Sequence, residues 1–193
     1  LDGDTDLAIA YSALRWFEND GSGAFTTHVL SGTPPGDHIL LADIDGDLDT
    51  DMLLAGLDSD AYRALNDGVG NFGPITPALQ VVYPGAKTTS LKLMDMEGDG
   101  DLDLYLWYLS WNLGLPDELV RCVNDGSGTF TYAGDIMVSN LFQPYAVGYA
   151  DGDQTPDVLG LGNHALQLHL SGGGGLLRLN SVAAPLCLAL HGT

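Results

Sequence analysis

Short apolar runs, separated by polar stretches rich in glycine and aspartate, follow one another along the chain. Within residues 37–85 they fall at 39–42, 52–57, 62–65 and 72–82. The same series recurs within residues 86–142, at 90–94, 104–108, 119–123 and 130–138. Glycine and proline in the gaps disfavour helices of ordinary length, and no apolar period of 3.6 residues persists for ten residues. The pattern predicts an all-β chain built of four-stranded units.

A turn motif separates the third and fourth runs of each unit. The pattern Asn-Asp-Gly-x-Gly-x-Phe occurs at residues 19–25, 66–72 and 124–130. Asn-Asp-Gly between apolar runs is a strong hairpin signal, because tight hairpin turns need positive φ angles. We therefore expect the third and fourth strands of a unit to be joined there.

An acidic loop separates the first and second runs and keeps step with the turn. It occupies residues 43–51 and 95–103, and shorter copies lie at 151–157 and 2–6. The alternation of loop and turn divides the chain into repeats of approximately 1–36, 37–85, 86–142 and 143–193 within one domain or segment. Four-stranded units repeated in tandem predict a β-propeller of about four repeats, in which each blade packs on its neighbours.

Alternating carboxylates around a glycine suit a hard cation that takes six to eight oxygen ligands. Counted from the first aspartate, positions 1, 3, 5 and 9 supply side-chain ligands: Asp43, Asp45, Asp47 and Asp51 in one loop, and Asp95, Glu97, Asp99 and Asp103 in the next. Position 7, Asp49 or Asp101, is expected to supply a backbone carbonyl while its own carboxylate points outward. The fourth repeat offers Asp151, Asp153 and Asp157, with Tyr149 at position 1. The loops therefore predict Ca²⁺ as the cofactor.

Other metal sites fit the loops less well. An EF-hand requires glutamate at position 12 between two helices, whereas Leu54 and Leu106 stand there. Magnesium demands compact octahedral geometry, and zinc prefers nitrogen or sulfur ligands. A repeat of turn-forming aspartates with no metal is the plain alternative, and it weighs most for the first and fourth repeats.

The loop and turn together resemble FG-GAP or VCBS-type repeats, which are found in integrin α-subunit propellers and many secreted proteins. The resemblance covers the chain to about residue 171 and is most specific for the second and third repeats. It implies a β-propeller in which a calcium loop joins the first two strands of each blade. Such propellers usually have seven blades, so the chain is expected to be either part of a larger propeller or a small one.

Charge and composition restrict the partners. The net charge is −20, but most acidic residues lie in the loops. Nucleic-acid binding depends on Lys and Arg, of which the chain has 6, so nucleic acid is not expected as a partner. The apolar stretch 176–190 is shorter than a membrane helix of about 20 residues and contains Arg178 and Pro185, so no membrane span is expected. Cys122 and Cys187 either form a disulfide or remain two buried thiols.

No catalytic motif appears, and we expect no enzymatic activity. The best candidates for ligand recognition are Trp107, Tyr108 and Trp111, since the third repeat carries about six extra residues beside them. These rings either stack on a glycan or partner, or pack between blades.

The predicted function is a non-enzymatic, extracellular calcium-binding repeat module for adhesion or assembly. Its expected partners are calcium and either another protein or further copies of itself. A carbohydrate-binding propeller, or a non-catalytic segment of a secreted polysaccharide-acting enzyme, is the alternative. In the tail, residues 176–182 are expected to form the last strand of blade four. The run 185–190 is expected to replace the missing first strand of blade one, which would close the ring.

Overall fold

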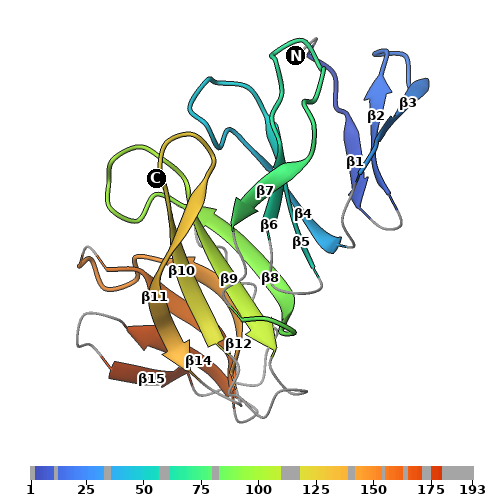
Figure 1. Ribbon diagram of the computed structural model, residues 1–193. Coiled ribbons are helices and arrows are strands. Elements are labelled where there is room, and N and C mark those ends of the chain that lie inside the picture. Colours follow the sequence, from blue (N-terminus) through green and yellow to red (C-terminus); the bar gives the residue numbers. More distant parts are fainter. Residues whose placement is uncertain are drawn as a thin grey trace.

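The computed structural model describes residues 3–10, 13–32, 36–56, 61–79, 83–109, 118–138, 142–153, 155–162, 165–170 and 175–179. All of its regular structure is β, in four antiparallel sheets whose strands neighbour one another in chain order (Figure 1). The described residues contain no helix, and therefore none that could cross a membrane. The all-β prediction is confirmed.

The first sheet has three strands and each of the others has four. The first comprises β1 (Leu7–Ala10), β2 (Leu14–Asn19) and β3 (Phe25–Leu30). The second comprises β4 (Gly36–Ala42), β5 (Asp51–Gly56), β6 (Ala61–Ala64) and β7 (Thr76–Leu79). The third comprises β8 (Lys87–Met94), β9 (Asp103–Leu109), β10 (Glu118–Asn124) and β11 (Phe130–Val138). The fourth comprises β12 (Phe142–Gly148), β13 (Asp157–Gly162), β14 (Ala165–Leu170) and β15 (Gly175–Leu179).

The acidic loop joins the first two strands of each complete sheet, and the Asn-Asp-Gly turn joins the last two in the second and third sheets. One predicted strand begins later than expected. Phe72 forms only an isolated bridge with Asn66, and Gly73 donates its backbone N–H to Leu65 before β7 starts at Thr76. Pro74 lies in that gap, where its missing N–H and fixed φ disfavour a continuous ladder.

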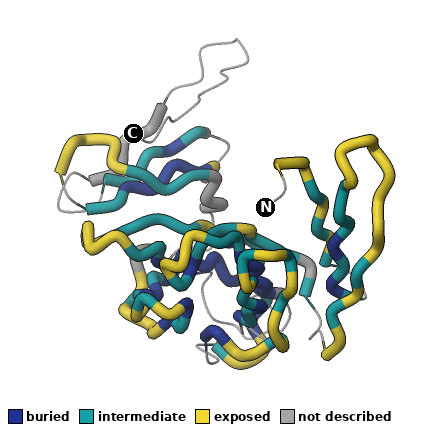
Figure 2. The backbone as a smooth tube through the Cα atoms, turned by 90° about the horizontal axis from the view of Figure 1, so that it is seen from above, coloured by how far each residue is buried: buried dark blue, intermediate teal, exposed yellow. Residues whose placement is uncertain are grey.

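Successive sheets stack along an arc. β4 contacts both β1 and β8, β12 contacts β8, and β7 contacts β11. Figure 1 places β1–β3 and β14–β15 at opposite ends of this arc, and Figure 2 shows from above that the exposed residues lie mainly in the loops. Among the described strands the arc is open. The first apolar run of the tail forms β15, whereas the run 185–190 lies outside the described residues, so ring closure stays a prediction.

The core lies between the sheets. Its largest cluster joins the second and third sheets and includes Leu53, Leu104, Leu106 and Phe130. β9 is buried along Asp103–Tyr108 because it is a central strand with a neighbouring sheet on each side. Cys122 is a free, buried thiol in the same cluster, and burial raises its pKa to about 12.

The aromatic residues of the third repeat contribute to this core. Trp107 is 2% exposed and Tyr108 is fully buried. Neither ring faces solvent, which supports packing between blades over the stacking on a ligand that was also predicted. Trp111 lies outside the described residues.

Candidate metal centre

In the second and third sheets, the last aspartate of the acidic loop joins that loop to the hairpin turn of the same sheet. Asp51 is fully buried; its Oδ2 accepts the backbone N–H of Ile44 at 3.1 Å and its Oδ1 accepts that of Asn66 at 2.8 Å. Asp103 does the same with Met96 at 2.9 Å and Asn124 at 2.8 Å. The turn asparagine also donates a hydrogen bond to the loop, from Asn66 Nδ2 to the carbonyl of Thr50. Loop and turn recur in phase because each satisfies backbone groups of the other.

The first aspartate folds the loop back on itself. Asp43 accepts the backbone N–H groups of Gly46 at 2.8 Å and Leu48 at 3.0 Å. Asp95 repeats both bonds with Gly98 and Gly100. Leu48 has φ of 74°, where its counterpart Gly100 has 98°. This left-handed backbone is natural for glycine and costs a leucine strain.

The carboxylate at position 7 lies against the turn glycine. A Cβ built on Gly68 would stand 2.4 Å from Oδ2 of Asp49, and one built on Gly126 would stand 2.8 Å from Oδ2 of Asp101. The carboxylate therefore packs on the turn of its own sheet, and its predicted orientation away from an ion is not contradicted. The coordinating role of the position 7 carbonyl stays a prediction.

Replacing Gly68 with alanine should lower the free energy of unfolding by roughly 1–3 kcal/mol. Its φ of 78° strains any side chain, and the new methyl group would collide with Asp49. Urea unfolding measures the loss. Gly46→Ala is the matched control, because Gly46 has φ of 79° and open space around its Cβ position. A loss no larger than that of the control would contradict the steric role assigned to Asp49.

Three carboxylates of the second repeat converge. One oxygen from each of Asp43, Asp45 and Asp51 lies within 4.8 Å of the other two. Oδ1 of Asp45 is buried with no hydrogen-bond partner. Burial, and then the charges of Asp51, Asp47 and Asp43, raise the pKa of Asp45. Burial likewise raises the pKa of Asp51, against the two backbone bonds that it accepts. An orphaned oxygen among crowded carboxylates fits a hard cation.

Asp47 is not a member of this group. Its Oδ1 accepts the backbone N–H of Asp49 at 2.9 Å. Asp99 makes the equivalent bond with Asp101 at 3.1 Å. The predicted role of position 5 as a metal ligand in these two loops stays a prediction. Its carboxylate also shapes the acidic loop, because it accepts the backbone N–H of position 7.

The third repeat departs from the second at position 3. Among the described residues, its carboxylates are not gathered to within 4.8 Å, although its loop has as many acids as that of the second repeat. Glu97 pairs with Arg121 at 3.6 Å. Burial raises the pKa of Glu97, contact with Asp103 raises it further, and the Arg121 charge opposes the shift. Glutamate has one methylene more than aspartate, which lets it reach this arginine.

The fourth repeat forms a group of its own. Oxygens of Asp151, Asp153 and Asp157 lie within 4.8 Å of one another, and Asp157 is 1% exposed. Position 1 is Tyr149, whose hydroxyl donates to the carbonyl of Asp95 at 2.9 Å. Tyr149 thus links two sheets where the other loops carry an aspartate. Its sequence predicts a less complete site than that of the third repeat, yet its carboxylates converge and those of the third do not.

Comparison with known families agrees with this geometry. A family model for the FG-GAP-like repeat matches residues 1–54 and 43–106. Together the two matches cover more than half of the chain, which therefore belongs to the FG-GAP-like repeat family. A search of curated proteins found no match.

Proposed function

We propose that the chain is a calcium-stabilised module of propeller type that works outside the cell in adhesion or assembly, without catalysis. The main support for a metal site is the convergence of Asp43, Asp45 and Asp51, where one buried oxygen of Asp45 has no hydrogen-bond partner. An all-oxygen, all-carboxylate set favours calcium over zinc. Calcium is plentiful outside cells, and sites in extracellular modules often have Kd values of about 10⁻⁴–10⁻³ M.

The fold supports a mechanical role for the ion. Asp51 accepts hydrogen bonds from Ile44 in the acidic loop and from Asn66 in the hairpin turn. A cation bound beside Asp51 would therefore strengthen the connection between this residue and a turn that lies 15 residues further along the chain. FG-GAP-like repeats are typical of extracellular proteins, which supports a location outside the cell. The open arc and the stacking of repeats support assembly with another protein or a further copy. The burial of Trp107 and Tyr108 gives the carbohydrate-binding alternative no support.

Equilibrium dialysis of the metal-free protein against radioactive calcium tests the proposal. We expect saturable binding, and we expect Asp45→Asn to remove one bound ion while leaving the fold intact by circular dichroism. Asp67→Asn is the matched control, because Asp67 is an exposed aspartate of the neighbouring turn. If calcium does not bind, or if Asp45→Asn and Asp67→Asn bind as many ions as the wild type, the second repeat is not a calcium site.

A further inference from the structure

One position in the strand before each Asn-Asp-Gly turn directs its side chain differently from sheet to sheet. This pre-turn position lies three residues before the turn asparagine and is held by Trp16 on β2, Arg63 on β6 and Arg121 on β10. In each of these sheets it pairs with the residue two places after the last aspartate of the acidic loop. The pre-turn side chain therefore starts from the same level of every sheet.

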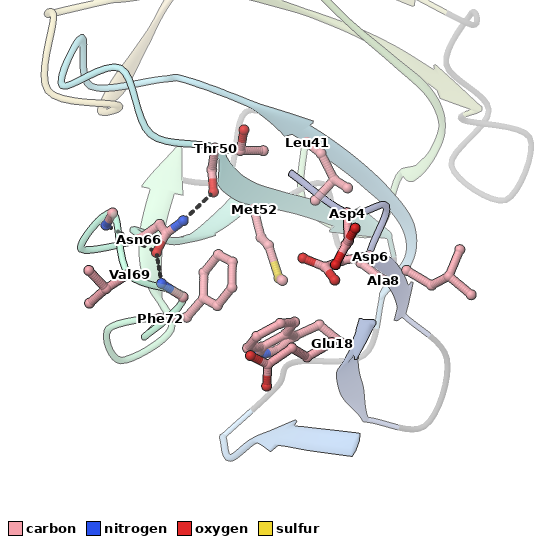
Figure 3. Close-up of a pocket in the computed structure, with 14 residues that line it drawn as sticks. Asp4, Asp6, Ala8, Glu18, Leu41, Thr50, Met52, Asn66, Val69 and Phe72 are labelled. Carbon is pink, nitrogen blue, oxygen red and sulfur yellow. Dashed lines mark hydrogen bonds between the residues drawn. The ribbon is translucent and has the colours of Figure 1, made fainter. Parts of the chain in front are cut away.

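In the first two sheets the pre-turn side chain reaches forward to the turn of the next sheet. The indole of Trp16 would stand 3.4 Å from a Cβ on Gly70, and both residues line one cavity with Phe72 (Figure 3). Arg63 Nη1 donates a hydrogen bond to the carbonyl of Ser127 in the turn of the third sheet. In these sheets the pre-turn position thus connects neighbouring sheets.

Arg121 turns instead to the acidic loop of its own sheet. One guanidinium nitrogen lies 3.6 Å from Oε2 of Glu97, at position 3 of that loop. The exposed fractions of the two side chains are 37% and 34%, so water screens the pair only in part. The third loop therefore has beside it a positive charge that belongs to the chain itself.

In the two loops whose carboxylates converge, the pre-turn position brings no such charge. In the second repeat Arg63 bonds the next sheet, and Oδ1 of Asp45 is buried without a hydrogen-bond partner. In the fourth repeat the counterpart of Arg121 is Leu168 on β14, which also pairs with the residue two places after the last aspartate. Carboxylates held within 4.8 Å of one another repel unless a cation balances them. These two loops fit a bound ion, and the third does not.

We propose that Arg121 is a built-in cation that takes the place of calcium in the third loop. The inference rests on the calcium function proposed above and excludes the third loop from it. A guanidinium donates hydrogen bonds to carboxylate oxygens and keeps its charge at any physiological pH. Glu97 has one methylene more than aspartate, so its carboxylate reaches Arg121 instead of joining the other carboxylates. The third sheet, which contacts a sheet on each side, then keeps its loop–turn junction when calcium is scarce.

Equilibrium dialysis tests this inference at free calcium up to about 10 mM, roughly ten times the weakest Kd expected of extracellular sites. We expect Arg121→Gln to bind one more ion than the wild type, because the third loop loses its internal cation. Arg63→Gln is the matched control, since it removes the same charge from the same strand position but contacts the next sheet, so no ion is gained. Glu97→Gln should leave the number of ions unchanged, whereas Asp45→Asn at the same loop position removes one.

Calorimetric melting separates the charge of Arg121 from its packing. Without calcium, Arg121→Gln should melt at a lower temperature than the wild type, and saturating calcium should remove most of the difference because the ion enters the vacated loop. Arg63→Gln should melt lower by the same amount with and without calcium. If Arg121→Gln does not fold, the double variant Arg121→Leu with Glu97→Asp copies the leucine of the fourth sheet and the aspartate of the second, and it should gain the same ion.

Two results would overturn the inference while calcium binding at the second loop still stands. One is the loss of an ion on Glu97→Gln, and the other is an equal number of ions on the wild type and on Arg121→Gln. An absence of calcium binding in every one of these proteins would refute the proposed function as well.

Discussion

Replacing Asp51 with alanine is expected to lower the free energy of unfolding by roughly 2–6 kcal/mol. The carboxylate is fully buried and accepts the backbone N–H groups of Ile44 and Asn66. Alanine would leave both donors without a partner in the place where loop and turn meet. Loss of this size is a large fraction of the 5–15 kcal/mol that typically holds a domain together. Urea unfolding in calcium-free buffer measures it without any contribution from a bound ion.

Asp67 provides the matched control for this experiment. Its carboxylate also accepts two backbone N–H groups, from Val69 and Asn71, both at 3.1 Å. Asp67 is exposed, so water can replace the bonds that Asp67→Ala removes, and we expect a loss of about 1 kcal/mol or less. Similar losses for the two variants would show that burial at the loop–turn junction contributes nothing. Asp51→Asn, which keeps the shape of the side chain, remains measurable if Asp51→Ala does not fold.

The strand pattern was predictable because the signals that determine it are local. Short apolar runs, Asn-Asp-Gly turns and acidic loops each act over fewer than a dozen residues. Their fixed phase predicted four-stranded units, and the second, third and fourth sheets are such units. The reason for the fixed phase is not local and could not be predicted from the sequence. The bonds of Asp51 and Asp103 to the turn residues Asn66 and Asn124 join positions that lie far apart in the chain.

The metal candidates were harder to rank, since contacts from other strands decide which carboxylates converge. The loop of the third repeat looked complete in sequence, but Arg121 on β10 attracts Glu97. The loop of the fourth repeat looked degenerate because Tyr149 replaces the first aspartate, yet Tyr149 reaches back to the preceding loop and the remaining acids gather. The same limitation applies to Trp107, whose burial depends on the neighbouring sheet rather than on its own repeat.

Removal of calcium is expected to lower the melting temperature by roughly 5–10 °C for each occupied site. An ion present at 100 times its Kd stabilises the folded state by about 2.7 kcal/mol, provided that the unfolded chain does not bind it. Calorimetric melting of the metal-free protein with and without added calcium measures the shift. Magnesium chloride at equal ionic strength is the control for screening of the net charge of −20, because magnesium rarely accepts an all-protein carboxylate cage.

This shift should grow as the pH rises. Burial raises the pKa values of Asp45 and Asp51 in the folded, calcium-free protein. Between the unfolded pKa near 4 and the raised folded values, the folded state binds more protons than the unfolded state. The stability of the calcium-free protein therefore falls as pH rises through that window. Calcium requires the deprotonated carboxylates, so the calcium-loaded protein lacks this loss. The difference in melting temperature between the calcium-loaded and the calcium-free protein should therefore be larger at about pH 7.5 than at about pH 5. A calcium effect that is constant or shrinks toward pH 7.5 would place the ion away from Asp45 and Asp51.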